Sequence, residues 1–300
     1  MQKVVIYGGS GFLGRLIQNA CLAQGFSVVI VDRNAPPEQS GVSFVLADTT
    51  YPITKNDFLR NPYAVINLTG KNIAQRFTEQ HRKEIHTTRI MSTRNIVRLF
   101  ENPEYRPDVF IQASAVGYYG NRGNDILGES DEPGSSFLST VVIDWEQEAR
   151  VAEQYDVRTV ILRQGNVLGR GGFLAKMVPW YKRFLGGPIG SGDFWFSWIH
   201  ADDLVRLYLH CMQKKNMKGV FNAVTSPVLY KDFSAGLAKS LGVPHFFTIP
   251  VMVLRIAYKG LADEMTSSTR AVSHRLSHYE FSFHFHDYMH ALWDLKKYWK

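Results

Sequence analysis

The first predicted strand of this chain runs directly into a turn in which a glycine recurs at every third position. An apolar segment at residues 4–7 is followed by Gly8, Gly11 and Gly14, a G-x-x-G-x-x-G variant of the dinucleotide-binding fingerprint. Gly8 permits the tight turn, Gly11 lets backbone approach a pyrophosphate, and Gly14 lets the next helix pack closely. The amides that open this helix face the phosphates with the positive end of the helix dipole behind them. Because the glycines lie between a strand and an amphipathic run, they predict nucleotide binding rather than a chance glycine-rich turn.

Strand and helix signals alternate through the first two thirds of the chain, which is typical of a parallel sheet with crossover helices. The predicted strands are short and rich in Val and Ile, as expected when both faces of a sheet are covered. They cover residues 3–7, 27–32, 42–46, 64–68, 109–113 and 159–163, and the predicted helices between them cover 11–24, 78–99 and 137–154. This pattern predicts an α/β fold, a Rossmann doubly wound parallel sheet.

The last third of the chain follows a different pattern. Its predicted elements are a helix at 173–185, a strand near 195–199, a helix at 202–213, further helical stretches and a strand-like alternation at 279–285. We predict that residues 1–170 form a dinucleotide-binding core to which 195–225 return. Residues 171–194 and 226–300 would form a smaller α+β C-terminal lobe, with a ligand cleft between the two units. The glycine-rich segment 186–192 is a candidate lid or substrate-contact loop.

Composition excludes several classes of partner. No apolar run reaches the 18 or more residues of a membrane span, and the chain starts in a strand, so we expect neither a membrane partner nor a signal peptide. Cys21 and Cys211 follow no metal or redox spacing, which favours buried thiols in a cytoplasmic protein. The net charge of +7 comes from scattered basic residues without a nucleic-acid motif, so it favours attraction of an anionic cofactor or substrate and no nucleic-acid partner.

The end of the second predicted strand gives conflicting signals about the cofactor. The Asp32 carboxylate would hydrogen-bond the adenosine ribose and repel a 2′-phosphate, which favours NAD. Arg33 would instead stack on adenine or pair with a 2′-phosphate, which favours NADP, unless both belong to a charged loop with no cofactor role. Asp48 is placed either to meet the adenine edge or to cap the next turn. The other candidate cofactor contacts lie in the glycine turn and after the fourth strand: Ser10, Phe12, Leu13, Leu68, Thr69 and Gly70.

Motifs along nearly the whole chain resemble the extended short-chain dehydrogenase/reductase superfamily, and more closely its atypical epimerase family branch. Besides the glycine turn they are NLTG at 67–70, SAVGYYG at 114–120, WEQEA at 145–149, RQGNVLG at 163–169, GGPIGSG at 186–192 and SWIHADDL at 197–204. The resemblance implies a nicotinamide-binding Rossmann fold, a likeness to sugar-nucleotide epimerases and often a homodimer. Within these motifs Arg163 is a further candidate cofactor contact. Branch members more often bind NADP, with Arg33 as the matching residue, whereas Asp32 departs from that pattern.

The chain departs further from the resemblance in its catalytic residues. Typical members use a Ser, a Tyr and a Lys four residues after the Tyr, whose charge lowers the pKa of the phenol. Counted back from Arg163, the Tyr and Lys positions fall near Val141 and Trp145, and no Tyr lies between 137 and 154. One Tyr-x-x-x-Lys occurs at 51–55, but it precedes the fourth strand, so we interpret it as coincidence.

Other side chains must then carry any chemistry. Ser114, at the end of the fifth predicted strand, is expected to hydrogen-bond a substrate carbonyl or hydroxyl, the alternative being a role in stabilising the turn. Tyr118 and Tyr119 are candidate proton donors, one of which would only pack. Asp144 and Glu146 on the next helix would act as acid or base within a cleft, or would simply be solvated on an exposed helix.

One further motif contains residue types that can bind a metal. His200, Asp202 and Asp203 have no standard ligand spacing, and Asp202 is expected to N-cap the following helix. The sequence therefore favours a structural role there and predicts no metal.

Together these features predict an NAD(P)-dependent oxidoreductase or epimerase-like enzyme. Its substrate would be a small molecule with a hydroxyl or carbonyl group, with sugar nucleotides among the candidates. The alternative is a catalytically silent NAD(P)-binding sensor or regulatory module. The absent Tyr–Lys pair favours the sensor, whereas Ser114 and the aromatic residues Tyr118, Tyr119, Trp145 and Trp198 favour the enzyme.

Overall fold

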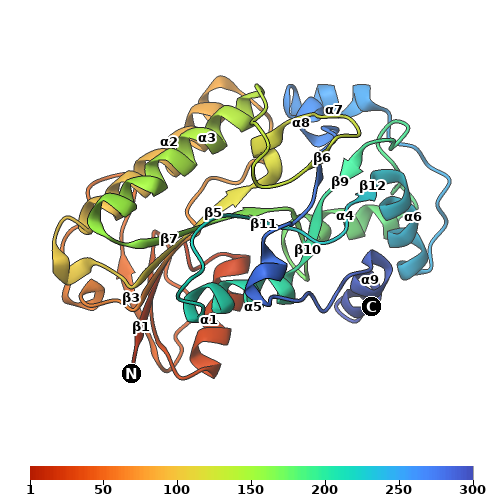
Figure 1. Ribbon diagram of the computed structural model, residues 1–300. Coiled ribbons are helices and arrows are strands. Elements are labelled where there is room, and N and C mark those ends of the chain that lie inside the picture. The colour runs from red at the N-terminus through yellow and green to blue at the C-terminus, as the bar shows by residue number, and fades with distance from the viewer. Residues whose placement is uncertain (300) are drawn as a thin grey trace.

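A seven-stranded sheet forms the centre of the computed structural model, which describes residues 1–299 (Figure 1). The strand order is β11-β7-β5-β4-β1-β2-β3, and every pairing within it is parallel. The chain therefore leaves β1 toward one edge and returns from β4 toward the other, which confirms the predicted doubly wound α/β fold. The strands are β1 (Lys3–Tyr7), β2 (Ser27–Asp32), β3 (Val42–Leu46), β4 (Ala64–Asn67), β5 (Val109–Ala115), β7 (Arg158–Gln164) and β11 (Gly219–Ala223).

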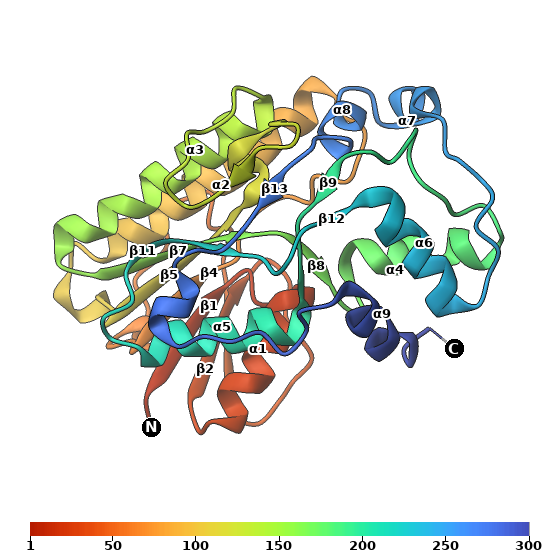
Figure 2. The same cartoon turned by 45° about the vertical axis from the view of Figure 1, so that its right-hand side comes forward.

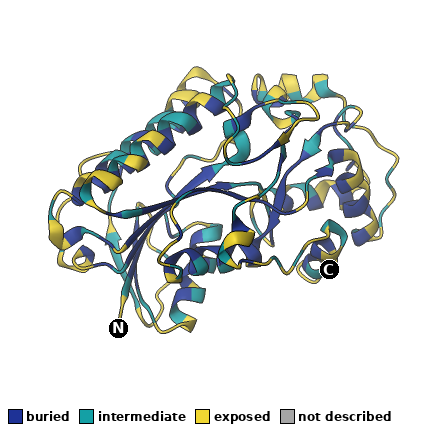
Figure 3. Cartoon of the chain, viewed as in Figure 1, coloured by how far each residue is buried: buried dark blue, intermediate teal, exposed yellow. Residues whose placement is uncertain are grey.

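Helices cover both faces of this sheet because successive strand residues point to opposite sides. Val4 and Ile6 of β1 pack on the face covered by α1 (Phe12–Ala23) and α5 (Ala201–Gln213). Val5 and Tyr7 pack on the other face, beside α2 (Glu79–Leu99) and α3 (Phe137–Arg150). Figure 3 shows the sheet buried between these layers and the outward faces of α2 and α3 exposed.

Side-chain caps set the starts of the two long helices. The hydroxyl of Thr78 accepts from the backbone amide of His81 at the start of α2, and that of Ser136 accepts from Ser139 at the start of α3. The predicted helix 137–154 ends earlier, at Arg150. A 3₁₀ turn over Val151–Tyr155 replaces its last turn.

The second lobe, at the right of Figure 2, contains α4 (Gly172–Lys182), α6 (Tyr230–Leu241) and α9 (Tyr288–Lys296). It is built around its own apolar cluster, with Trp198, Phe233 and Leu292 among its buried members. Short sheets join it to the core: β8 (Asn166–Leu168) pairs with β10 (Trp198–His200), β9 (Trp195–Phe196) with β12 (Val228–Leu229), and β6 (Ile126–Leu127) with β13 (Arg270–Ala271). Its other helices are α7 (Val251–Tyr258) and α8 (Leu261–Met265).

Two predicted elements need correction, and one strand of the main sheet was not predicted. The strand β11 was missed, and the strand predicted near 195–199 divides at Ser197 into β9 and β10, which pair with different partners. Residues 279–285 form no strand. Their alternation arises because aromatic residues pack separately: Phe281 enters the sheet core and Phe285 stacks on His200 with ring centroids 3.8 Å apart. The amides of His284 and Phe285 donate to the buried Asp203 carboxylate instead of to a neighbouring strand.

Two sequence expectations about the interior and the membrane can be compared with the structure. Cys21 and Cys211 are buried free thiols, as predicted, and burial raises the pKa of Cys21 to about 12. Within residues 1–299, no helix combines the length and hydropathy needed to cross a membrane.

Candidate functional site

The glycine turn lies at the carboxyl end of β1, and each predicted glycine has a distinct environment. Gly8 has φ +75°, in the left-handed region, and a Cβ there would lie 2.9 Å from the Leu68 carbonyl carbon. A Cβ on Gly14 would lie 2.4 Å from the Gly9 carbonyl oxygen, because α1 packs directly on the turn. A Cβ on Gly11 would meet nothing nearer than the Gly8 oxygen at 3.7 Å. The fold itself thus requires Gly8 and Gly14, whereas Gly11 keeps space open in front of the turn.

The first turn of α1 offers free backbone amides to this space. Gly11 is its N-cap residue and supplies no side-chain hydrogen bond, and no acidic side chain occupies the first turn. Amides at a helix start lack intrahelical acceptors, and the helix dipole adds positive charge there. This terminus has the chemistry of a phosphate-binding site.

Asp32, at the end of β2, is held against the glycine turn. Its Oδ2 accepts from the Ser10 amide at 3.1 Å and its Oδ1 from the Arg33 amide at 2.7 Å. The Ser10 hydroxyl donates to the Asn34 carbonyl at 2.6 Å. The Arg33 side chain is exposed and makes no hydrogen bond within residues 1–299. The carboxylate, rather than the guanidinium, is therefore fixed beside the turn.

Two candidates beyond the turn have well-defined local partners. Asp48 accepts from the amide and hydroxyl of Thr50, at 3.0 and 2.7 Å, which is the turn-capping arrangement weighed above. Thr69 donates from its amide and its hydroxyl to Asn67 Oδ1, at 3.0 and 2.6 Å, and fixes the chain at the end of β4. A Cβ on the next residue, Gly70, would lie 3.0 Å from the Arg89 guanidinium carbon.

A cavity of about 350 Å³ joins the glycine turn to the carboxyl ends of β4, β5 and β7. This volume is suited to a small molecule or part of a dinucleotide. It brings together five predicted cofactor residues of the turn, Leu68 and the predicted catalytic Ser114. The lining residues are Gly8, Gly11, Phe12, Leu13, Gly14, Leu68, Arg89, Ala113, Ser114, Ala115, Trp145, Gln164 and Gly165.

Behind Ser114 lies a buried ion pair. The Ser114 hydroxyl, at the end of β5, donates to Glu146 Oε1 on α3 at 2.6 Å. Arg163 of β7 donates from Nε and Nη2 to the two oxygens of the same carboxylate, at 2.8 and 2.9 Å. All three residues are less than 5% exposed. Burial alone would lower the pKa of Arg163, but the hydrogen bonds and charge of Glu146 raise it above its usual value.

Two neighbouring tyrosines complete the environment of Arg163. The Tyr119 hydroxyl accepts from Arg163 Nη1 at 3.0 Å and lies 2.8 Å from the Gly128 carbonyl and from Asn222 Oδ1. Burial raises the pKa of Tyr119 to about 12, and its hydroxyl is already occupied by these buried partners. The Tyr118 ring lies under the guanidinium, 3.3 Å from its carbon. Neither tyrosine, nor Arg163 itself, is among the lining residues of the cavity.

The helix positions that carry Tyr and Lys in typical relatives hold apolar and aromatic side chains here. Val141 is buried with Phe77, Ile85 and Leu261. Trp145 lines the cavity and donates from its indole to the Thr93 hydroxyl at 2.9 Å.

Asp144 is not brought to the cavity. It faces α2, where its carboxylate lies 2.9 Å from His86 Nε2, and both side chains are about two-fifths exposed. Of the two carboxylates predicted on this helix, only Glu146 contacts Ser114.

Arg89 of α2 was missed by the sequence analysis, because an arginine on an otherwise polar helix carries no motif. It is the single ionisable residue among those that line the cavity. Its Nη1 donates to the carbonyls of Lys71 and Ile85, at 3.0 and 3.2 Å, and its guanidinium carbon lies 5.1 Å from the Trp145 ring. No carboxylate within the described chain pairs with it, and burial lowers its pKa to about 10. A buried guanidinium without a carboxylate partner is suited to an anionic or electron-rich ligand group.

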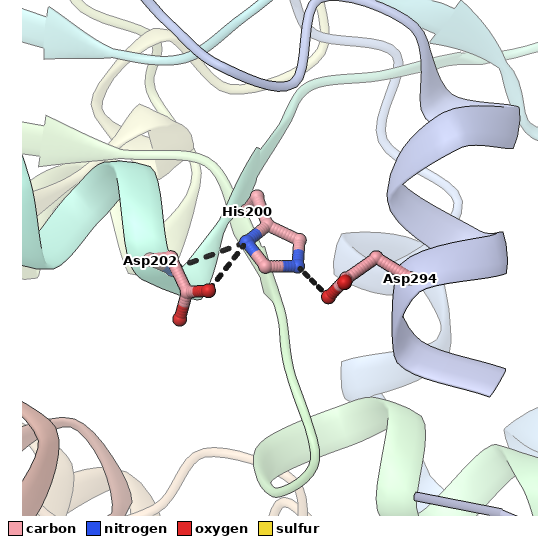
Figure 4. A group of neighbouring side chains, drawn as sticks. All are labelled: His200, Asp202 and Asp294. Atoms are coloured by element: carbon pink, nitrogen blue, oxygen red, sulfur yellow. Dashed lines mark hydrogen bonds and ion pairs between the residues drawn. The ribbon is translucent and has the colours of Figure 1, made fainter. Parts of the chain in front are cut away.

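The His200 side chain lies between Asp202, at the start of α5, and Asp294 of α9 (Figure 4). The residue that caps α5 is His200, and not Asp202 as predicted. Its imidazole Nδ1 accepts from the Asp202 amide at 3.2 Å. The ring can reach this amide because it is buried and stacked on Phe285. Nε2 then carries the hydrogen and faces Asp294 Oδ2 at 3.5 Å. The other Asp294 oxygen accepts from Lys297 at 2.8 Å. With one ring nitrogen used as a cap and a lysine on the carboxylate, these residues favour a helix cap over a metal site.

The predicted lid segment 186–192 is packed against its neighbours. Gly186 and Gly187 are buried, and a Cβ on Gly187 would overlap the Phe247 carbonyl oxygen. The Gly190 amide donates to Ile249, and the Ile249 amide to Pro188, at 2.9 and 2.8 Å. These contacts hold the segment as a wall of the second lobe rather than as a free lid.

Comparisons with known proteins agree on the family and the fold. Residues 4–223 match the model of the NAD dependent epimerase/dehydratase family. The epimerase family protein YfhF of Bacillus subtilis is 33% identical, over 97% of this chain and 96% of that protein. The structure of the human epimerase family protein SDR39U1 with NADPH superposes with a TM-score of 0.88 at 26% identity, covering 99% of both chains. A nucleoside-diphosphate sugar epimerase from Corynebacterium glutamicum gives a TM-score of 0.79 at 28% identity, over 99% of this chain and 58% of that one.

Proposed function

This chain belongs to the NAD-dependent epimerase/dehydratase family, and from that premise we propose that it binds a nicotinamide dinucleotide along the glycine turn and moves a hydride between the nicotinamide and a hydroxyl or carbonyl carbon held against Ser114. The observation that carries the proposal is the single cavity that joins the open face of Gly11 to Ser114. A dinucleotide whose pyrophosphate lies on the α1 amides has its nicotinamide directed along this cavity toward the β5 end.

Asp32 is the residue that we propose selects between NAD and NADP. Its carboxylate is fixed at the turn by two backbone amides, and a charge held there opposes a 2′-phosphate. The structure of the human relative contains NADPH, so membership of the family does not by itself favour NAD. We propose that this chain takes NAD in preference to NADP, with Arg33 too exposed and unattached to reverse the preference.

Ser114 is the proposed contact of the reacting oxygen. Because its hydrogen is directed to Glu146, its oxygen lone pairs are available to a substrate hydroxyl in the cavity. A bound nicotinamide would supply the hydride acceptor when that substrate is oxidised. The hydroxyl proton passes to Ser114 as the serine proton passes to Glu146. Glu146 is a positioning residue and proton acceptor that acts through Ser114, and Arg163 holds it in place.

Arg89 is proposed to supply the positive charge that a lysine supplies in typical relatives. Its guanidinium faces the cavity with two nitrogens, Nε and Nη2, that make no hydrogen bond within the described residues. Negative charge develops on the substrate oxygen as its proton leaves, and a fixed cation nearby stabilises that charge. The second lobe is proposed to complete the substrate site. Sugar nucleotides are the first class to test, since a relative named as a nucleoside-diphosphate sugar epimerase superposes over 99% of this chain.

The test separates binding from chemistry. Purified protein is titrated with NADH and NADPH by nicotinamide fluorescence and then screened with NAD⁺ and NADP⁺ for turnover of sugar nucleotides and simple alcohols. Ser114→Ala is expected to keep cofactor affinity within about twofold and to lower turnover by roughly 10²-fold or more. Arg89→Gln is expected to lower turnover while Arg89→Lys restores part of it. A protein that binds neither coenzyme would overturn the whole proposal.

A second function, a cofactor-binding sensor without turnover, is favoured by one observation. The helix positions that hold the acid/base pair in typical relatives are Val141, packed in an apolar cluster, and Trp145, bonded to Thr93. A sensor would bind the coenzyme tightly, turn over none of the screened substrates, and show no effect of Ser114→Ala.

A further inference from the structure

The outer surface of the second lobe exposes apolar side chains that a globular surface normally buries. Phe246 is 77% exposed, Ile256 is 70% exposed and Met252 is 62% exposed. We call this set the apolar face. It comprises Trp180, Phe184, Leu185, Phe246, Phe247, Met252, Val253 and Ile256. Contiguous exposed apolar patches of this kind mark interaction sites.

Helix α7 is the clearest part of the apolar face and lies at the upper right of Figures 1 and 2. Its inward side chains, Val251 and Leu254, pack partly against the lobe core. No residue of α7 is fully buried, and its exposed positions hold Met252, Val253 and Ile256, with Arg255 as the one charged residue of the helix. The helix is therefore mostly apolar on the side that faces away from the protein, the reverse of an ordinary surface helix.

The rest of the apolar face adjoins α7 along a short pair of backbone segments. Residues 187–190 run beside 247–251: Ile189 and Ile249 form a parallel bridge, and a Cβ on Gly190 would lie 3.0 Å from a Val251 methyl. The end of α4, with Phe184 and Leu185, leads directly into this contact. Side chains from α4, the loop before α7 and α7 itself thus belong to one surface.

The backbone at Phe184 shows that this exposure is held in place by the fold. Helix α4 ends in a Schellman motif, in which the Phe184 amide donates to Tyr181 and the Leu185 amide to Trp180. The position taken by Phe184 has φ +60°, where glycine is preferred and a bulky residue is strained. A strained aromatic that points outward and is more than half exposed does nothing for the core, so its role lies at the surface.

The two chain segments that carry the apolar face contain basic residues and no acidic ones. Neither residues 172–192 nor residues 233–262 contain an Asp or Glu. The same segments carry exposed basic side chains, Lys176, Lys182, Arg183, Lys239, Arg255 and Lys259. Asp263, the first acidic residue beyond α7, is paired with Arg255 at 2.9 Å. A partner that covers this surface must accept apolar side chains and match positive charge.

We propose that the apolar face docks on an anionic lipid surface, with the aromatic and aliphatic side chains in the headgroup–acyl boundary and the basic side chains on the phosphates. Interfacial helices combine these two features, an apolar face and flanking Lys or Arg. A second copy of this chain fits less well, because a self-complementary interface would bring the basic side chains of both copies together. The contact is peripheral and rests on no membrane-spanning helix.

Vesicle flotation tests the docking with the full chain. Vesicles of phosphatidylcholine alone are compared with vesicles that contain phosphatidylglycerol, at low and at high salt. We expect binding to the anionic vesicles only, and its loss at high salt. Met252→Ser with Ile256→Ser is expected to weaken binding by at least about tenfold, since each buried apolar side chain contributes to interfacial affinity. Trp293→Ser is the matched control, because Trp293 is 55% exposed on α9, which lies apart from α7 in both views (Figures 1 and 2).

Phe184→Gly separates a surface role from a structural one. Glycine suits the left-handed position, so this variant is expected to keep its melting temperature and its coenzyme affinity while it loses vesicle binding. The proposal is overturned if the wild-type protein floats with neither kind of vesicle, or if Trp293→Ser weakens binding as much as the α7 variant. Concentration-dependent dimerisation that the α7 variant abolishes, without vesicle binding, would assign the surface to a second copy instead.

Discussion

The two walls of the cavity are built in different ways. One wall is mainly backbone: Gly8, Gly11 and Gly14 leave open space in front of the α1 amides, and Phe12 and Leu13 also line it. The Asp32 carboxylate lies beside this turn, on the Ser10 amide. The opposite wall is made of side chains from four elements, with Ser114, Glu146 and Arg163 locked together behind the surface. The difference teaches that the proposed cofactor contacts depend on glycine spacing within one short segment. The proposed catalytic chemistry would depend on side chains from separate elements, Ser114 on β5, Glu146 on α3 and Arg163 on β7.

The largest expected effect breaks the side-chain wall. Glu146→Gln leaves Arg163 buried without its counter-charge, which we expect to cost about 3–5 kcal/mol of unfolding free energy. Urea denaturation measures this value. Asp144→Asn, two residues away on α3, is the matched control, because its pair with His86 is partly exposed and contributes about 1 kcal/mol or less. Equal losses in the two variants would contradict the buried network.

The next effect concerns the backbone wall alone. Gly11→Ala meets no protein atom closer than 3.7 Å, so the fold should tolerate it, but the methyl group fills the approach to the pyrophosphate. We expect the coenzyme Kd to rise about 30-fold, close to 2 kcal/mol, with an unchanged melting temperature. Titration by nicotinamide fluorescence and a thermal melt check both parts.

Gly14→Ala is the contrast to this variant. Its Cβ would lie 2.4 Å from the Gly9 oxygen, so it should lose stability as well as binding. If Gly11→Ala bound the coenzyme normally, the open space beside Gly11 would not be the phosphate site.

A third, smaller effect concerns the dependence of stability on pH near neutrality. Arg163 is held charged and the pKa of Tyr119 is about 12, so stability changes between pH 5 and 8 must come from elsewhere. His200 is one source: burial lowers its pKa although Asp202, Asp294 and Asp203 act to raise it.

The sign of the His200 effect follows from this direction. The unfolded chain takes up a proton below about pH 6.5 while the folded ring stays neutral, so stability falls as pH drops, by at most about 1.4 kcal/mol per pH unit. Urea midpoints from pH 5 to 8 should fall less steeply for His200→Asn, since asparagine keeps the N-cap acceptor. Identical slopes would remove His200 from this explanation.

The smallest effect sharpens the description of the backbone wall. Asp32→Ala removes the carboxylate held beside the turn, so we expect NADPH affinity to rise about threefold to tenfold, roughly 0.7–1.4 kcal/mol, and NADH affinity to fall. Fluorescence titration with both coenzymes measures the two changes. Unchanged NADPH affinity would show that another group sets the preference.

Much of the fold could be predicted because its signals are local. The strands 3–7, 27–32 and 42–46 have the predicted bounds, since short Val- and Ile-rich runs next to turns leave few alternatives. The errors occur where long-range packing overrides local pattern. The alternating residues 279–285 pack their aromatic rings one by one, and the cap of α5 is a buried histidine that composition alone disfavours.

The sequence by itself determined the parallel sheet, the phosphate-facing turn and the absence of the usual Tyr–Lys pair, because strand periodicity and glycine spacing act over a few residues. Only the tertiary structure decided that Glu146 belongs with Ser114 while Asp144 does not, that Arg89 enters the cavity, and that α7 presents its apolar side outward. Those arrangements join residues dozens of positions apart, and the distance between such side chains is set by how helices pack on the sheet, which no short segment encodes.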